Sequence, residues 1–125
     1  MPPTAENLES GRHEYNEHCA PCHGLDGSGR NQFEADFLPQ IPRLTGDVQS
    51  LSDGELYFVI TSGVRNTAMP GFGARHNAEE IWRIILWVRH LAHLKPEERA
   101  DIGREITNKE RGHEEIMRQG RASGD

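Results

Sequence analysis

The stretch "EHCAPCHGLDG", residues 17–27, contains both cysteines of the chain, two residues apart, with His23 directly after the second. Before it runs a stripe of residues spaced i, i+3, i+4, i+7 and i+11, which predicts a helix over roughly residues 4–18. The stripe consists of Leu8, Gly11, Arg12, Tyr15 and Cys19. Because glycine is unfavourable inside a helix, Gly11 is interpreted as a notch where another helix crosses closely. The predicted helix delivers Cys19 to the same side as its core face.

The pattern "CAPCH", residues 19–23, has the spacing of a c-type haem attachment site. Two thiols separated by two residues on a turn can add to both vinyl groups of one porphyrin. The next residue then brings an imidazole to the iron. Cys19 and Cys22 are therefore predicted to hold one covalently attached haem c, with His23 as the proximal ligand. Gly24 permits the chain to leave this turn.

Two other chemistries use the same residues. The first is a zinc site with four ligands: Cys19, Cys22, His23 and either His18 or His13. Structural zinc sites generally draw their ligands from two separated pairs, and the chain has no second cysteine pair. The second is a redox-active disulfide, which would favour a βαβ setting that the helical periodicities oppose. Haem attachment is the favoured interpretation.

The opposite face of the iron needs a ligand from elsewhere in the chain. Met1 is terminal and Met117 lies in a charged tail, whereas Met69 lies in "NTAMPGFG", a glycine-bounded loop between two apolar helices. Met69 is therefore predicted as the distal ligand. The competing ligand is a second histidine, either His76 or one of the pair His90 and His93. For that pair, and for His13, His18 and His113, a surface position is favoured.

A methionine ligand has a functional consequence. Its soft thioether favours ferrous iron and raises the reduction potential. Two strong axial ligands also close both faces of the iron, so no position is left for oxygen or a substrate. This arrangement suits electron transfer rather than catalysis.

The composition agrees with a domain built around a non-protein centre. Of the 125 residues only 34% are apolar, and the mean hydropathy is −0.75. One domain of this length usually buries more apolar surface. Wrapping a haem would bury several hundred Å² of apolar surface. At about 25 cal/mol per Å², this burial would stabilise the folded state by on the order of 10 kcal/mol. The haem-free chain is therefore expected to be largely unfolded.

Charge and hydropathy exclude other classes of protein. The net charge of −6 argues against a nucleic-acid partner and suits a protein partner with a basic docking patch. No run of 18 apolar residues exists, so no membrane span is predicted. The start of the chain lacks the basic and apolar regions of a secretory signal.

The rest of the chain divides into loops, two capped helices and a tail. Residues 24–50 are loop-like, with a short helix expected around 33–37. Ser52 and Glu55 predict a capping box that begins a helix ending at Gly63. Asn77 and Glu80 predict the start of the most apolar helix, with the stripe Ile81, Ile84, Ile85, Val88 and Leu91. Pro96 ends that helix or opens the next one. A domain over 1–95 is thus followed by a charged extension over 96–125, partly helical and disordered at its end.

At this point the sequence resembles a class I cytochrome c over residues 5–95. The resemblance implies an all-α fold: three main helices plus loops wrapped around one covalently bound haem, here with a charged C-terminal helical extension. It also implies that the first and last helices cross at small and aromatic residues. In this sequence these are Gly11 and Tyr15 against Trp87 and Leu91.

The resemblance also suggests residues around the haem. A proline carbonyl, that of Pro42 or Pro39, would accept the second N–H of His23. Aromatic side chains would line the haem pocket, although plain core packing explains them equally well. These are Tyr57, Phe58 and Phe72. Two arginines, Arg43 and Arg65, are within reach of a haem propionate by resemblance, but a free surface position is favoured for both.

The function implied is that of a monohaem carrier of single electrons between redox-partner proteins whose identity is open, and not that of an enzyme. Docking is expected around Ala20, Pro21 and the Met69 loop. Two alternatives remain: the electron-entry haem domain of a larger oxidoreductase, and a haem-based gas sensor in which Met69 is displaced. The resemblance implies a periplasmic or otherwise extracytoplasmic location, with the signal or anchor absent from this chain. A monomer or weak dimer is expected.

Overall fold

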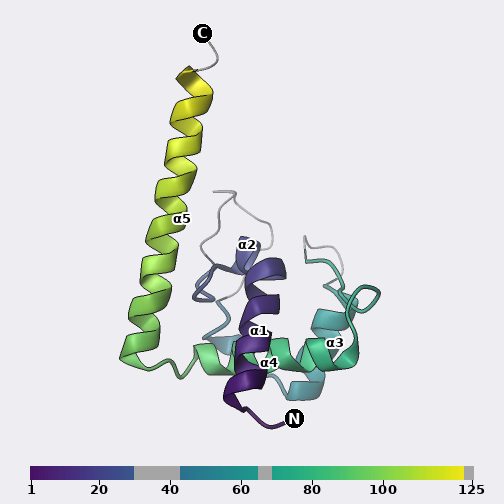
Figure 1. Ribbon diagram of the computed structural model, residues 1–125. Helices are drawn as coiled ribbons and strands as arrows, with labels where there is room; N and C mark the ends of the chain where they lie inside the picture. The colour runs from purple at the N-terminus through teal and green to yellow at the C-terminus, as the bar shows by residue number, and fades with distance from the viewer. Residues whose placement is uncertain (30–42, 65–68, 123–125) are drawn as a thin grey trace. The chain divides into compact units, whose positions relative to one another are not determined.

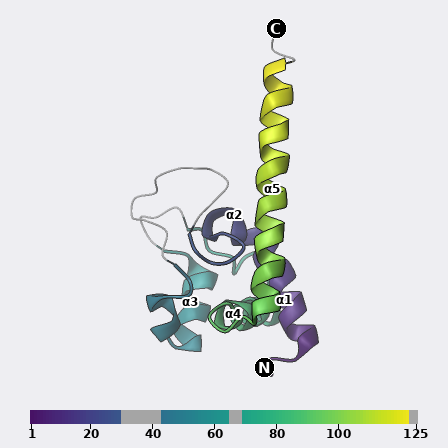
Figure 2. The same ribbon diagram turned by 90° about the vertical axis from the view of Figure 1, so that its left-hand side faces the viewer.

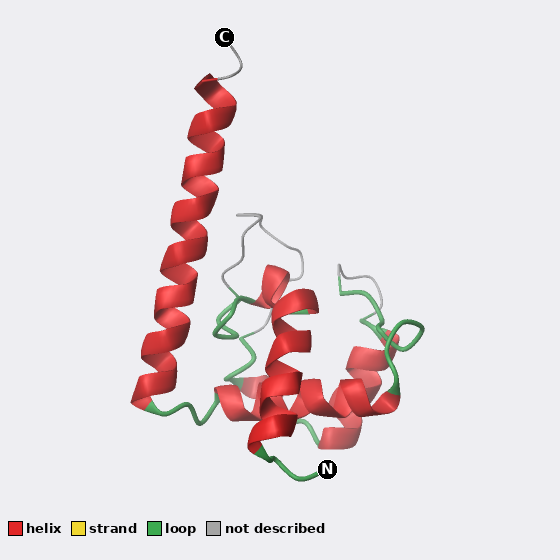
Figure 3. Ribbon diagram, viewed as in Figure 1, coloured by secondary structure: helices red, strands yellow, loops and turns green. Residues whose placement is uncertain are grey.

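The computed structural model describes residues 1–29, 43–64 and 69–122. These residues form helices and connecting loops, without a strand among them (Figures 1 and 3). The chain separates into two compact units, residues 1–94 and residues 95–125. The first contains α1 (Ala5–His18), α2 (Ala20–His23), the 3₁₀ helix η1 (Asp47–Ser50), α3 (Asp53–Ser62) and α4 (Ala78–Leu91). The second contains α5 (Pro96–Ala122). The predicted all-α architecture is confirmed.

Local capping signals fix where the helices begin. The hydroxyl of Ser52 accepts the N–H of Glu55 at 3.1 Å, and the Glu55 carboxylate accepts the N–H of Ser52 at 3.0 Å. This capping box confirms the predicted start of α3. These hydrogen bonds from Ser52 also lower the pKa of Glu55. The side chain of Asn77 accepts the N–H of Glu80 at 2.9 Å, which confirms the predicted start of α4.

The core forms where α1 crosses α4 (Figure 1). At the crossing, a Cβ added to Gly11 would overlap the backbone carbonyl of Arg83. The predicted notch at Gly11 is therefore confirmed, and the backbone that fills it belongs to Arg83. The apolar side chains buried around this crossing, and between α3 and α4, are Tyr15, Leu56, Ile60, Ile81, Ile84, Ile85, Trp87, Val88 and Leu91.

Arg89 joins α4 to the segment that precedes α3. Its guanidinium donates to the backbone oxygens of Gln49 at 2.8 Å and Leu51 at 2.5 Å, and to the carboxylate of Asp53 at 3.0 Å. The side-chain amide of Gln49 also donates to the backbone oxygen of Val88 in α4 at 2.9 Å. Nothing in the sequence pattern had indicated this network.

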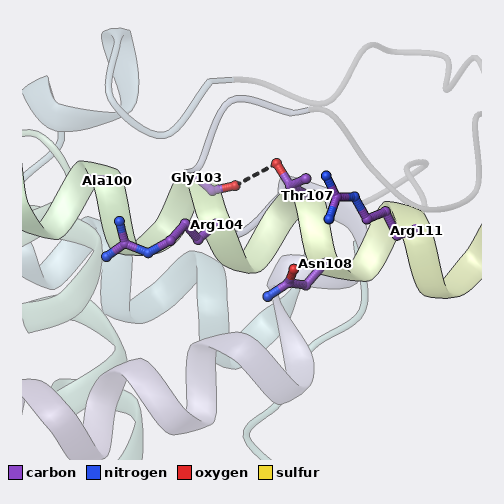
Figure 4. A pocket seen from close by; sticks show the side chains of 6 residues that line it. All are labelled: Ala100, Gly103, Arg104, Thr107, Asn108 and Arg111. Carbon is purple, nitrogen blue, oxygen red and sulfur yellow. Dashed lines mark hydrogen bonds between the residues drawn. The ribbon is translucent and has the colours of Figure 1, made fainter.

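The unit of residues 95–125 contains the long helix α5, which Pro96 opens. The helix continues to Ala122, so residues 121 and 122 of the end predicted to be disordered (residues 121–125) are helical, and residues 123–125 lie outside the described residues. Figure 4 shows a depression along this helix, lined by Ala100, Gly103, Arg104, Thr107, Asn108 and Arg111. Thr107 donates there to the oxygen of Gly103 at 3.0 Å. The lining contains no thiol, imidazole or thioether, so it offers no ligand for iron. Among the described residues, no helix combines the length and apolarity needed to cross a membrane.

Candidate functional site

The "CAPCH" sequence forms a single helical turn directly after α1. The N–H of Cys19 donates to the oxygen of Tyr15 at 2.8 Å, so Cys19 caps α1. The N–H of His23 donates to the oxygen of Cys19 at 2.8 Å, which closes the turn of α2. Residues three apart on a helix share one face, so the turn places the Cys19 and Cys22 side chains on the same side. Both thiols are free and half-buried, and the side chain of His23 is also half-buried.

The chain leaves this turn at Gly24. Gly24 has φ 83°, a left-handed conformation that is strained for residues with a side chain. Its N–H donates to the oxygen of Ala20 at 2.8 Å. The following loop returns to the turn, where the N–H of Gly29 donates to the oxygen of His23 at 2.8 Å. The backbone on both sides of His23 is thus held by hydrogen bonds.

Tyr15 attaches this turn to the helix crossing. Its side chain is completely buried, and its hydroxyl donates to the oxygen of Gly24 at 2.7 Å. Burial, with smaller contributions from Cys19 and Asp26, raises the pKa of Tyr15 well above its usual range. The hydroxyl therefore stays protonated and remains a donor at any physiological pH.

Replacing Tyr15 with phenylalanine is expected to lower the free energy of unfolding by about 1–3 kcal/mol, because the buried oxygen of Gly24 loses its donor. Denaturant unfolding of the haem-loaded protein measures this loss. The matched control is Tyr57→Phe, at a half-buried ring that stacks on Trp82 with centroids 4.9 Å apart. The control is expected to stay within about 0.5 kcal/mol of the parent protein. Equal losses in the two variants would contradict a role for the Tyr15 hydroxyl.

The electrostatics of Cys19 weigh against the disulfide interpretation. Burial raises the pKa of Cys19 to about 12, and the neighbouring Cys22 and Glu14 add to the shift. The thiolate is the form that binds metals and exchanges disulfides. A Cys19 that stays protonated at neutral pH is therefore a weak nucleophile for disulfide exchange.

Met69 lies in the segment that leads back from α3. Its backbone oxygen accepts the N–H of Val64 at 3.3 Å. Further along, the N–H of Phe72 donates to the oxygen of Ile60 at 2.9 Å, and that of Gly73 donates to the oxygen of Thr61 at 3.0 Å. The segment is therefore attached to the last turn of α3. The side chain of Met69 is half-buried.

The same segment also reaches the end of α1. The ring of Phe72 lies 6.1 Å from that of His18, and the ring of His76 lies 4.7 Å from it. His18 directly precedes Cys19, so the segment that carries Met69 approaches the haem-attachment turn. Figures 1 and 2 show α2 and the 69–77 segment on the same side of α4. The structure thus brings together the two segments predicted to supply the iron ligands.

The remaining predicted residues lie in several environments. Tyr57 packs on Trp82, whereas Phe58 is 68% exposed and lies outside the core of the described residues. A haem-pocket role for these two residues stays a prediction. Arg43 is exposed, as favoured. The predictions for Pro39, Pro42 and Arg65, and for the helix around 33–37, fall outside the described residues.

The other histidines also take up different positions. His90 is half-buried, with its ring 5.3 Å from that of Trp87, and His93 is exposed, as is His13. His76 is mostly buried, and its Nδ1 donates to the Glu80 carboxylate at 3.0 Å. This contact is the main reason why the pKa of Glu80 is lowered.

One polar cluster was missed by the interpretation of the sequence. Glu14, His18, His76 and Glu80 meet where α1, the 69–77 segment and α4 come together. The only sequence signal is the spacing of four within each pair, Glu14 with His18 and His76 with Glu80. That spacing places Glu14 and His18 on one face of α1, whereas His76 precedes the first residue of α4. It does not show that the two pairs approach each other.

The described residues fit a c-type haem. The donor set consists of two unpaired thiols and an imidazole on one turn, with a thioether on a neighbouring segment. In the part of the chain that the structure describes, Thr61 Oγ1 and Trp87 Nε1 are buried without a hydrogen-bond partner. Buried donors of this kind need an acceptor, and a haem contributes two carboxylates.

Comparisons with known proteins agree with this chemistry. The family model "Cytochrome C oxidase, cbb3-type, subunit III" matches residues 6–88. A solved structure from Kuenenia stuttgartiensis, a reducing HAO-like protein complex, is similar with a TM-score of 0.62 and 25% sequence identity. That match covers 73% of this chain and 46% of the other, so the chain spans about half the length of the chain it resembles. No curated protein matches.

Proposed function

The chain belongs to the family of cbb3-type cytochrome c oxidase subunit III, and we propose that it is a monohaem electron carrier with iron ligated by His23 and Met69. Members of this family are c-type cytochromes with a covalently bound haem c. The observation that carries the proposal is the α2 turn, where two free thiols and an imidazole lie within five residues. The family establishes haem-based electron transfer. The carrier role and the ligand pair are our proposal.

Each residue has one task in this proposal. Cys19 and Cys22 would hold the porphyrin, and the hydrogen-bonded backbone around His23 holds the main chain from which the imidazole extends. When bound, the haem supplies a one-electron iron couple. The thioether of Met69 would close the second face, leaving no position for a substrate, so the protein would act as a carrier and not as an enzyme.

The position of His76 supports Met69 as the distal ligand. Its Nδ1 lies 3.0 Å from the Glu80 carboxylate and 3.7 Å from that of Glu14. The imidazole that competed most directly with Met69 is thus already engaged by two carboxylates.

The test is a pair of methionine variants. Oxidised wild-type protein is expected to show the weak near-infrared sulfur-to-iron band, and Met69→Ala is expected to lose it. Reduced Met69→Ala is also expected to bind carbon monoxide rapidly, which the wild type should resist. Met117→Ala, a change in α5, is the control and should keep the band. A band missing from the wild type would transfer the distal role to a histidine, and a band that survives in Met69→Ala would transfer it to another methionine.

A second candidate function is favoured by the comparisons. The matched chain belongs to a redox complex and is about twice as long as the stretch matched here, and the family is that of an oxidase subunit. The chain would then be the electron-entry haem domain of a larger oxidoreductase. Purification from the native source separates the two functions. A carrier would elute near its own 14.1 kDa, as a monomer or weak dimer, whereas an entry domain would elute as part of a larger assembly.

Partners and location follow from the same proposal. Cytochrome c domains are typically extracytoplasmic, and we place this one in the periplasm. The formal charge of −6 favours redox partners that present a basic docking patch. Such docking is expected to weaken as salt is added, because exposed charges are screened within about 10 Å at 0.1 M ionic strength.

A further inference from the structure

We propose that Glu14, His18, His76 and Glu80 form a second metal site, separate from the haem, that binds a zinc-type divalent cation. The four side chains come from three parts of the chain. Glu14 and His18 lie one turn apart on α1, His76 lies at the end of the 69–77 segment, and Glu80 lies in the first turn of α4. Imidazole nitrogens and carboxylate oxygens are ligands that zinc accepts in proteins.

The distances between donor atoms already approach those of a coordination shell. Glu14 Oε2 lies 3.6 Å from His18 Nε2 and 3.7 Å from His76 Nδ1. His76 Nδ1 lies 3.0 Å from Glu80 Oε2. Zinc–ligand bonds of about 2.0–2.2 Å place the donors of a tetrahedral site about 3.4 Å apart. The ligand atoms of Glu14, His18 and His76 all lie within 4.8 Å of one another, and Glu80 joins this group through its contact with His76.

The surroundings hold the four groups in place while leaving access for a cation. The His76 side chain is only 9% exposed, whereas Glu14, Glu80 and His18 are 23%, 31% and 39% exposed. The ring of Phe72 lies against both imidazoles, 6.1 Å from His18 and 5.8 Å from His76. One side of the cluster is therefore an apolar wall, and the other opens to solvent.

The charges also balance. Two carboxylates and two neutral imidazoles around a divalent cation give a site with no net charge. Without a cation, the same four groups form a polar contact in which His76 bonds to Glu80 and the Glu14 carboxylate faces both histidines. A bound cation would join α1, directly before Cys19, to the segment that carries Met69 and to the start of α4.

Zinc titration of the haem-loaded, chelator-treated protein by isothermal calorimetry tests the site. In that form both thiols are bonded to haem and do not compete for zinc. Wild-type protein is expected to bind one Zn²⁺ per chain, and His18→Ala should weaken the affinity at least tenfold. The matched control is His13→Ala, which removes an exposed imidazole from the same helix and should bind as the wild type does. Haem absorption and helical circular dichroism should be unchanged in both variants.

Two further measurements make the test decisive. Glu14→Gln, which keeps the side-chain shape and removes the charge, should also lose at least tenfold in zinc affinity. X-ray absorption at the zinc edge should show nitrogen and oxygen neighbours at about 2.0–2.1 Å and no sulfur. The proposal is overturned if the wild type takes up no zinc, if His18→Ala and His13→Ala bind zinc equally, or if sulfur is found in the shell. None of these outcomes would affect the haem ligands proposed above.

Discussion

Replacing Gly11 with alanine is expected to destabilise the protein by about 3 kcal/mol or more. The added methyl group would overlap the carbonyl carbon and oxygen of Arg83, which are backbone atoms of a buried helix and cannot rotate away. Overpacking of a close-packed core typically costs 1–3 kcal/mol, and a backbone obstacle lies at or above the upper end of this range. A domain of ordinary stability, about 5–15 kcal/mol, would lose a large share of it.

The matched control is the same substitution at Gly54, inside α3. A Cβ there would meet only the side chain of Ser52 at 3.9 Å, an ordinary contact. Because alanine favours helix over glycine, Gly54→Ala is expected to stabilise the protein by about 0.5–1 kcal/mol. Thermal and denaturant unfolding of both haem-loaded variants measure the difference. Equal stability of the two variants would show that α1 and α4 do not depend on their close approach.

Replacing both Cys19 and Cys22 with serine is expected to abolish covalent haem attachment. Serine hydroxyls do not form thioethers, so the product expressed in a haem-attaching host should have the mass of the bare chain. Any haem retained by His23 alone should be removed by acidified acetone. Because the described polypeptide has a small apolar core, this variant is also expected to lose most of its helical circular dichroism.

Pro21→Ala serves as the control for that experiment. It changes a half-buried residue between the two cysteines and leaves both thiols and His23 in place. This variant should gain the mass of one haem and keep the red colour of the parent protein. A double serine variant that still carries a haem through acid extraction would contradict the assignment of the α2 turn as the attachment site.

Much of the domain could be predicted because its signals are local. The spacing of Cys19, Cys22 and His23 specifies a turn regardless of what surrounds it. The capping residues Ser52 and Asn77 mark helix starts through bonds that span only three residues. Gly11 was informative for a different reason, since a glycine inside an amphipathic helix needs a close neighbour to explain it.

The features that were missed depend on long-range approach. From the sequence, Arg89 looks like an ordinary surface residue of α4. Its guanidinium gains three partners only because residues 49–53 pack against α4 in the folded chain. His18 is exposed, as predicted, but its contact with His76 was missed because the two residues are 58 positions apart in the sequence. Periodicity identifies the face of a helix that is buried, but it contains no information on which distant polar group will meet that face.

The crossing of α1 and α4 also has a consequence for the order in which the protein is made. Gly11 and Arg83, which touch at the crossing, are 72 positions apart, near the two ends of the unit. Because the chain is synthesised from its N-terminus, residues 19–23 are exposed long before α4, the helix that completes the core, has been made. Contacts between distant positions form late, because the intervening loop has to be closed first. This delay leaves residues 19–23 accessible for haem attachment, and it makes α4 the helix that completes the core.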